Sequence, residues 1–214
     1  MRQADASGDA ARGRQKAAGM SRLREDTIRI IDMDTRALYK KKALPGLKEK
    51  FGYRNAMAAP RIEKAVVNIG IGRTREEKER TEIEKYAAMI TGQKPSARPA
   101  KKAIAAFKTR KGLIVGLQVT LRGARMDDFL SRLVSVALPR TRDFRGLDEK
   151  SFDRKGNLTI GIREHIVFPE MIGEDYKMLF GMEVTVVTTA KKREEGIALL
   201  KLMGFPIRSP ESRI

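Results

Sequence analysis

Alternating apolar and polar residues predict four β-strands along the chain. The clearest alternation runs over residues 112–122, where every second side chain is apolar, the spacing of a strand with one buried face. Residues 61–71 are rich in β-branched side chains and lie between a proline and a glycine, which also favours a strand. Two further strand candidates span residues 157–163 and 183–189.

Apolar residues at a spacing near that of a helical turn predict four helices. These helices span residues 36–51, 74–91, 126–138 and 191–203. We expect Pro45 to kink the first helix or to divide it in two, and Pro139 to end the third. The reason is that proline lacks the amide hydrogen that the interior of a helix requires.

The second and fourth helices also carry recognisable ends. Thr74 and Glu77 have the spacing of a capping box, in which each side chain accepts from the backbone N–H of the other residue. Gly92 and Gly204 stand where a left-handed glycine commonly ends a helix.

The order of these elements indicates the fold class. It reads α, β, α, loop, β, α, β, β, α, and most of the strands are too close in sequence for regular βαβ units. We therefore predict an α+β fold, with a mostly antiparallel sheet, helices packed on one face and the other face open. Residues 1–34 are predicted to be a disordered basic extension, and residues 35–214 a single domain.

One segment of the chain is unusual in its charge. From Lys85 to Met126 there is no aspartate or glutamate in 42 residues, but there are ten lysines and arginines. Such a segment repels itself unless an anion lies against it, and a phosphate backbone rewards each cation through counterion release. The formal net charge of +18 also makes nucleic acid the first partner to consider.

The composition argues against several other functions. The chain has no cysteine, and therefore no disulfide, thiolate nucleophile or cysteine-ligated zinc. Its single histidine, His165, is expected on the surface or in a loop. A Mg²⁺-dependent RNA-processing enzyme needs converging carboxylates, which the basic segment lacks. A membrane partner would require a long apolar run or a basic amphipathic helix. We predict no catalysis, metal, cofactor or membrane contact.

The two clearest strands each have a polar face, because side chains alternate along a strand. If both strands turn their apolar residues toward the helices, Asn68, Gln118, Thr120 and Arg122 stand together on the open face. Amide, hydroxyl and guanidinium groups suit the 2′-hydroxyls and phosphates of RNA. A merely solvated face, common in antiparallel sheets, is the alternative.

Residues 100–112 hold two apolar side chains, Ile104 and Phe107, among five cations. One interpretation is a β-hairpin whose apolar residues tuck back into the core. The other is a mobile loop that reaches a second RNA, with Phe107 near its tip. The sequence leaves both interpretations open.

Six stretches, in order along the chain, carry a resemblance to a known family. They are PRIEKAVVNIGIG (60–72), ITGQKPSARPAKKAIAAFKTRKG (90–112), GLQVTLRG (116–123), PRTRDFRGL (139–147), KSFDRKGNLTIGIREHIVFPE (150–170) and VTTAKKREEG with LLKLMGFP (187–206). On these residues the chain resembles the bacterial-type fifth protein of the large ribosomal subunit, which binds 5S ribosomal RNA.

The resemblance implies a structural, cytoplasmic and ribosome-bound protein of the central protuberance, without catalytic activity. Its implied partners are 5S rRNA, 23S-type rRNA, P-site tRNA, neighbouring large-subunit proteins and, across a bridge that residues 139–156 are candidates to form, a protein of the small-subunit head. The residues expected to bind 5S rRNA are Asn68, Gln93, Lys94, Gln118, Thr120 and Arg122. The residues expected to contact tRNA, in the loop 103–111, are Phe107, Lys108, Arg110 and Lys111.

Overall fold

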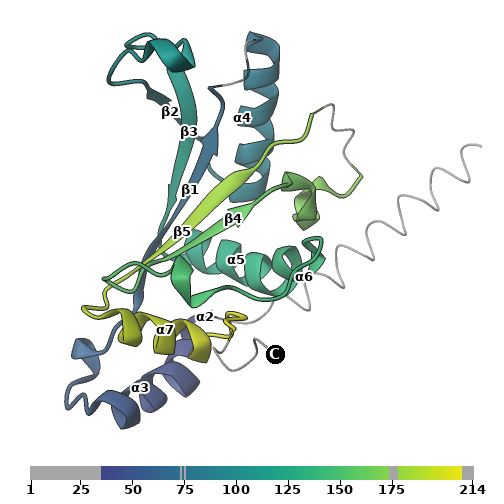
Figure 1. Ribbon diagram of the computed structural model, residues 1–214. Coiled ribbons are helices and arrows are strands. Elements are labelled where there is room, and N and C mark those ends of the chain that lie inside the picture. Colours follow the sequence, from purple (N-terminus) through teal and green to yellow (C-terminus); the bar gives the residue numbers. More distant parts are fainter. Residues whose placement is uncertain (1–34, 73, 75, 174–177, 209–214) are drawn as a thin grey trace, which may run out of the picture.

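The computed structural model describes residues 35–72, 74, 76–173 and 178–208, and its centre is a five-stranded sheet (Figure 1). The strands are β1 (Ile62–Gly70), β2 (Ser96–Pro99), β3 (Ile114–Leu121), β4 (Leu158–Ile162) and β5 (Met182–Thr188). Their order is β2-β3-β1-β5-β4, and every neighbouring pair is antiparallel. The predicted α+β fold is confirmed. The predicted extension, residues 1–34, lies outside the described residues.

Helices cover one face and one end of this sheet (Figure 1). The α-helices are α2 (Thr35–Leu38), α3 (Leu44–Phe51), α4 (Glu77–Thr91), α5 (Ala124–Arg132), α6 (Leu138–Arg140) and α7 (Arg193–Leu202). Two π-helical turns are η1 (Tyr39–Ala43) and η4 (Leu133–Ala137). Short 3₁₀ turns are η2 (Ala56–Ala58), η3 (Ala105–Phe107), η5 (Glu149–Ser151), η6 (His165–Val167) and η7 (Pro169–Met171).

Pro139 does not end the third helix as predicted, and the predicted division of the first helix near Pro45 takes the form of a π-helical turn between α2 and α3. Pro45 lies in the first turn of α3 and Pro139 in the first turn of α6, and each follows a π-helical turn that continues the preceding α-helix. A π turn widens the helix, so that the proline ring and its missing N–H are tolerated without a break. The backbone of the first helix therefore stays helical through Phe51, and the third helix passes Pro139 and ends at Arg140.

The prediction for the C-terminal end of α4 is confirmed, and the prediction for its N-terminal end is wrong. Gly92 has a φ of 65° and donates its N–H to the carbonyl of Ala88 at 2.8 Å, as predicted for a helix-ending glycine. The capping box is wrong, because α4 begins after Glu76, which makes no side-chain cap. The guanidinium of Arg80 instead donates to the carbonyl of Thr74, at 3.0 and 2.9 Å.

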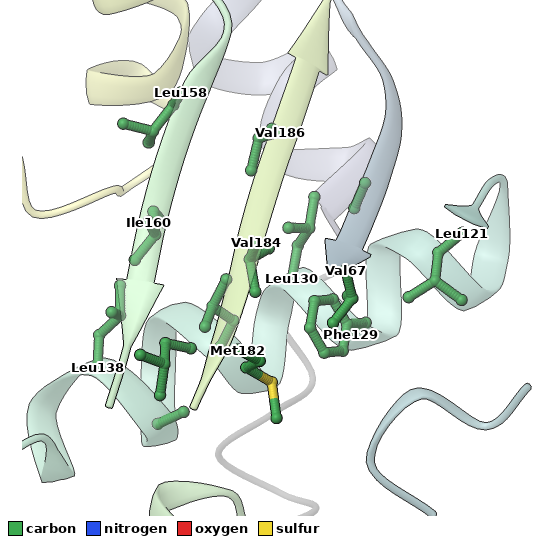
Figure 2. Packing of buried hydrophobic residues seen from close by; sticks show 14 of the residues in the cluster. Val67, Leu121, Phe129, Leu130, Leu138, Leu158, Ile160, Met182, Val184 and Val186 are labelled. Carbon is green, nitrogen blue, oxygen red and sulfur yellow. The ribbon is translucent and has the colours of Figure 1, made fainter. Parts of the chain in front are cut away.

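The core lies between the sheet and the helices. Figure 2 shows Val67, Ile160 and Val184 on neighbouring strands pointing to the side of α5, where Phe129 and Leu130 lie. All five side chains are almost fully buried. Burying a side chain of this size stabilises the fold by about 1.5–3 kcal/mol. Because these apolar residues occupy alternate positions, the residues between them form the opposite, open face.

His165 does lie in the connection between β4 and β5, but a surface position is excluded. Its ring is fully buried and stacks on Phe180, with 4.1 Å between ring centroids, and on Tyr86, at 5.6 Å. The histidine begins η6, shortly after the end of β4. Phe180, which precedes β5, packs against its ring. Both ring partners are distant in sequence, so the local pattern around His165 gives no sign of this burial.

The hairpin of β2 and β3 extends beyond the sheet at one end of the molecule, whereas α3 and α7 lie together at the other end (Figure 1). Within the described residues, we find no helix whose length and apolar content would let it span a bilayer.

Candidate nucleic-acid interface

Strand register brings the polar residues of the open face into rows that cross the sheet. In the first row, Asn68 lies opposite Gln118 on one side and opposite Glu183 on the other. The row continues outward to Ser96 on β2 and to Gly161 on β4. Amides from the two central strands are thus adjacent, at the spacing of a cross-strand pair. The prediction that Asn68 and Gln118 share one face is confirmed.

A second row, the hydroxyl row, crosses the sheet, and three of its four residues are threonines. Thr120 lies opposite Val66, which lies opposite Thr185. Thr185 in turn lies opposite Thr159, and their hydroxyl oxygens are 3.4 Å apart. Of the threonines in this row, only Thr120 was predicted from the sequence. The others were missed because which strand neighbours which is a long-range property.

Gln93 and Lys94 lie at the corner where α4 turns into β2. The side-chain amide of Gln93 donates to the backbone carbonyl of Thr120 at 3.5 Å, so this residue adjoins the hydroxyl row. The ammonium of Lys94 lies 3.7 Å from the carboxylate of Glu84 and is largely exposed. The fold therefore brings Gln93 to the edge of the polar face and leaves the ammonium of Lys94 exposed beside α4.

Arg122 stands at the end of β3, where its guanidinium lies 3.2 Å from the carboxylate of Glu63. Both side chains are about half exposed, so the pair adds little stability. Glu63 sits at an irregularity in the β1–β5 pairing, between Ile62 and Lys64. Glu63 also lines a hollow with Met126 of the helix side, so this ion pair lies at the end of the strands rather than in the middle of the open face.

Residues 100–113 form a hairpin arm, closed by hydrogen bonds between Ala100 and Leu113 and between Ile104 and Thr109. At its tip Phe107 is 76% exposed, and Lys108 has a left-handed φ of 50°. Of the two interpretations left open by the sequence, the hairpin geometry of the first is observed. The tucking of its apolar residues into the core is wrong, because Ile104 and Phe107 are both exposed.

All the cations of the arm are exposed. They are Lys101, Lys102, Lys108, Arg110 and Lys111. Under the arm lies an open hollow of about 830 Å³ at the end of β1, lined in part by Gly70, Gly72 and Phe107. The four residues expected to contact tRNA are thus gathered at one exposed end of the molecule.

A second basic surface, at the far end, was not predicted. It comprises the exposed cations of the first helix and of the loop that follows it, Lys40, Lys41, Lys42, Lys48, Lys50 and Arg54. Met57, 78% exposed, lies in the same loop. In the sequence, only the three consecutive lysines Lys40, Lys41 and Lys42 indicate this surface. They were overlooked because the acid-free segment is a much longer basic stretch.

Nothing in the described part of the chain suggests a metal centre, since no group of three or more His, Cys, Asp or Glu residues is placed to hold an ion there. The buried carboxylate of Glu170 is instead held by the guanidinium of Arg132, at 2.7 Å. Burial raises the pKa of Glu170, and the charge of Arg132 opposes that shift.

An α+β sheet with one polar face, flanked by exposed cations and an extended basic arm, defines the class of structured-RNA-binding proteins. Comparison with known proteins agrees with this class. Residues 55–110 match the family model described as ribosomal protein L5, and residues 114–207 match the model for the C-terminus of the same ribosomal protein family.

Curated relatives of the chain carry the name large ribosomal subunit protein uL5. The protein of Halothermothrix orenii is 52% identical over 169 residues, covering 78% of this chain and 94% of that protein. The protein of Thermus aquaticus is 48% identical over 179 residues, covering 83% and 98%. The chain belongs to the L5 family of ribosomal proteins, and it is a structural constituent of the large ribosomal subunit. The predicted ribosome-bound location is confirmed.

Proposed function

We propose that the open face of the sheet binds 5S rRNA and helps to attach it to the large subunit. The observation that carries this proposal is the row in which Asn68 and Gln118 lie side by side on the central strands. Amides and hydroxyls in a flat array suit the wide, shallow minor groove of RNA, where 2′-hydroxyls are displayed. Arg122 and Lys94 border this array and suit the phosphates on either side.

The same proposal assigns the arm to a different RNA. Phe107, Lys108, Arg110 and Lys111 project at the end of the hairpin, away from the hydroxyl row. An exposed aromatic side chain among cations can stack on a base or ribose while the cations meet phosphates. We assign P-site tRNA to this tip, as the family resemblance implies.

Further contacts complete the proposed role. The lysine-rich end formed by the first helix suits a 23S-type rRNA, since it offers cations on a surface remote from the arm. Neighbouring large-subunit proteins and a protein of the small-subunit head, met through residues 139–156, follow from the resemblance. The protein acts by holding RNA in place, without catalysis.

Binding of purified 5S rRNA, titrated at several salt concentrations, tests the central assignment. If Lys64, Lys94, Arg98 and Arg122 meet phosphates, log K against log salt should fall with a slope of roughly −3. Thr120→Ala should weaken binding severalfold. Thr81→Ala, which removes an exposed threonine hydroxyl from α4, serves as the matched control and should bind as the unaltered protein does. A flat salt dependence, or equal loss in both variants, would contradict the assignment.

A further inference from the structure

Glu183 stands on the open face, near the start of β5. It lies on β5, directly opposite Asn68 on β1 and opposite Gly161 on β4. Its side chain is exposed and shares a cross-strand row with the two amides of the proposed RNA site. An acid is unexpected on a surface that faces a polyanion, because a phosphate near it would be repelled.

Among the described residues, no cation lies within ion-pair distance of this carboxylate, and it makes no hydrogen bond there. Glu63, at the other end of the sheet, differs in this respect because it pairs with Arg122 at 3.2 Å. The strand partner Asn68 can offer an amide N–H group to RNA, whereas an ionised carboxylate can only accept. The row therefore presents donors and an acceptor side by side.

The surroundings of Glu183 leave room for a nucleotide. Glu183, Asn68 and Arg98 line a shallow hollow of about 520 Å³ on the open face. Gly70, Gly116 and Gly181 also line it, so no side chain rises from the sheet at these positions. Arg98 supplies a cation on the same hollow, where a phosphate can lie while another part of its nucleotide meets the carboxylate.

We propose that Glu183 is a specificity-determining residue that accepts a hydrogen bond from a donor group of the RNA seated in this hollow. The inference rests on the proposed binding of 5S rRNA to the open face. Phosphates carry no donor, whereas exocyclic base amino groups and ribose 2′-hydroxyls do. The carboxylate thus repels RNA whose phosphates fall at this position and accepts RNA whose donor falls there.

The test is a ratio of two affinities. Glu183→Ala is titrated with 5S rRNA and with an unrelated structured RNA of equal length, at fixed salt. We expect affinity for 5S rRNA to fall about tenfold, while affinity for the unrelated RNA stays the same or rises. Glu183→Gln keeps the shape and one acceptor oxygen, and its ratio should fall less. Glu194→Ala removes an equal charge from the exposed surface of α7 and is the matched control.

The possible results distinguish a failure of the Glu183 inference from a failure of the proposed 5S rRNA binding. Equal gains in affinity for both RNAs in the two Glu183 variants would identify a merely repulsive acid and overturn this inference. An unchanged ratio in both variants would overturn it as well. If the unaltered protein itself does not prefer 5S rRNA over the unrelated RNA, the proposed function fails instead.

Chemically altered 5S rRNA identifies the donor. Single 2′-deoxy substitutions, and base analogues that lack an amino group, are placed at the nucleotides that the protein protects. One of the two kinds of change should weaken binding to the unaltered protein and leave binding to Glu183→Ala unaffected. If both proteins respond alike to every substitution, no donor contacts Glu183 and the inference is wrong.

Discussion

The main chain of Gly156 lies directly against that of Gly196, at the point where the turn before β4 meets the first turn of α7. A Cβ atom built on Gly156 would lie 2.9 Å from the Cα of Gly196, and one built on Gly196 would overlap the carbonyl oxygen of Gly156. Gly156 also has a φ of 78°, where a side chain is strained. The two glycines allow α7 to close over this end of the sheet.

Gly196→Ala is therefore expected to destabilise the protein. Helix propensity alone would favour alanine by about 1 kcal/mol, but overpacking of backbone against backbone costs about 1–3 kcal/mol and cannot be relieved by a rotamer change. The net effect should be a loss of unfolding free energy, measured by urea denaturation. Gly161→Ala is the control, since a Cβ there meets nothing within 4 Å. A stabilised Gly196→Ala would mean that the contact yields easily.

This contact marks a limit of what the sequence could predict. The positions of β1, β3, β4 and β5 could be predicted from local sequence patterns, and the C-terminal ends of α4 and α7 from their glycines, whereas the edge strand β2 was missed. The pairing of Gly156 with Gly196 is not local, and neither is the position of Glu183 beside Asn68. Glycine has a low helix propensity, so local sequence preference gives no reason for Gly196 to lie inside α7.

In the candidate site, too, local features could be predicted from the sequence and long-range neighbours could not. Asn68, Gln118 and Thr120 could be assigned to one face from parity on two strands alone. Thr159 and Thr185 could not, because their place depends on the neighbours of β5 within the sheet. The π turns before Pro45 and Pro139 were missed for a different reason, since the same residues allow either a break or a widened turn.

The arm can be tested apart from the sheet. Replacing Phe107, Lys108, Arg110 and Lys111 together by alanine should leave 5S rRNA binding and the fold unchanged, because all four side chains are exposed at the tip. Ribosomes that carry this variant should release P-site tRNA faster, as measured by dissociation of labelled tRNA.

The control for the arm is Met57→Ala, because Met57 is exposed to the same degree as Phe107, 78% against 76%, but lies in a loop remote from the arm. It should leave tRNA release unchanged. Equal loss of 5S and tRNA binding in the arm variant would argue against two separate RNA surfaces.

The ion pair of Arg132 and Glu170 should couple three segments of the helix side. Its atoms are 2.7 Å apart, both side chains are mostly buried, and Arg132 also donates to the carbonyl of Ile90 at the end of α4. Arg132→Met and Glu170→Met should each lower the unfolding free energy by about 3 kcal/mol, since each leaves one charge without its partner.

A double-mutant cycle measures this coupling. The variant with both methionines should lose less than the sum of the two single losses, by about 0.5–3 kcal/mol, because no buried charge is left behind. Additive losses would show that the two residues act independently. Lys94→Met and Glu84→Met, from the exposed pair at 3.7 Å, should give almost no coupling.

Stability should fall in mild acid because of His165. Burial lowers the pKa of His165 from its ordinary value, and hydrogen bonding to the backbone of Phe180 opposes this shift only in part. The unfolded chain therefore takes up the proton first as pH falls below about 6.5. The stabilisation from this group is complete above that pH and is lost as pH falls toward the pKa of the folded state. The lost free energy should reach about 1 kcal/mol per pH unit within this window.

His165→Gln isolates the effect, because glutamine keeps a hydrogen-bonding side chain but does not titrate. Urea denaturation of both proteins at pH 7.5, 6.5 and 5.5, values chosen to bracket the ordinary pKa of roughly 6.5, should show the difference in unfolding free energy moving in favour of the variant as pH falls. Carboxylates titrate alike in the two proteins and cancel in this difference. His165 is the only histidine of the chain, so its NMR titration reports the folded pKa directly. Parallel pH curves for the two proteins would mean that the buried ring takes up a proton as readily in the folded chain as in the unfolded one.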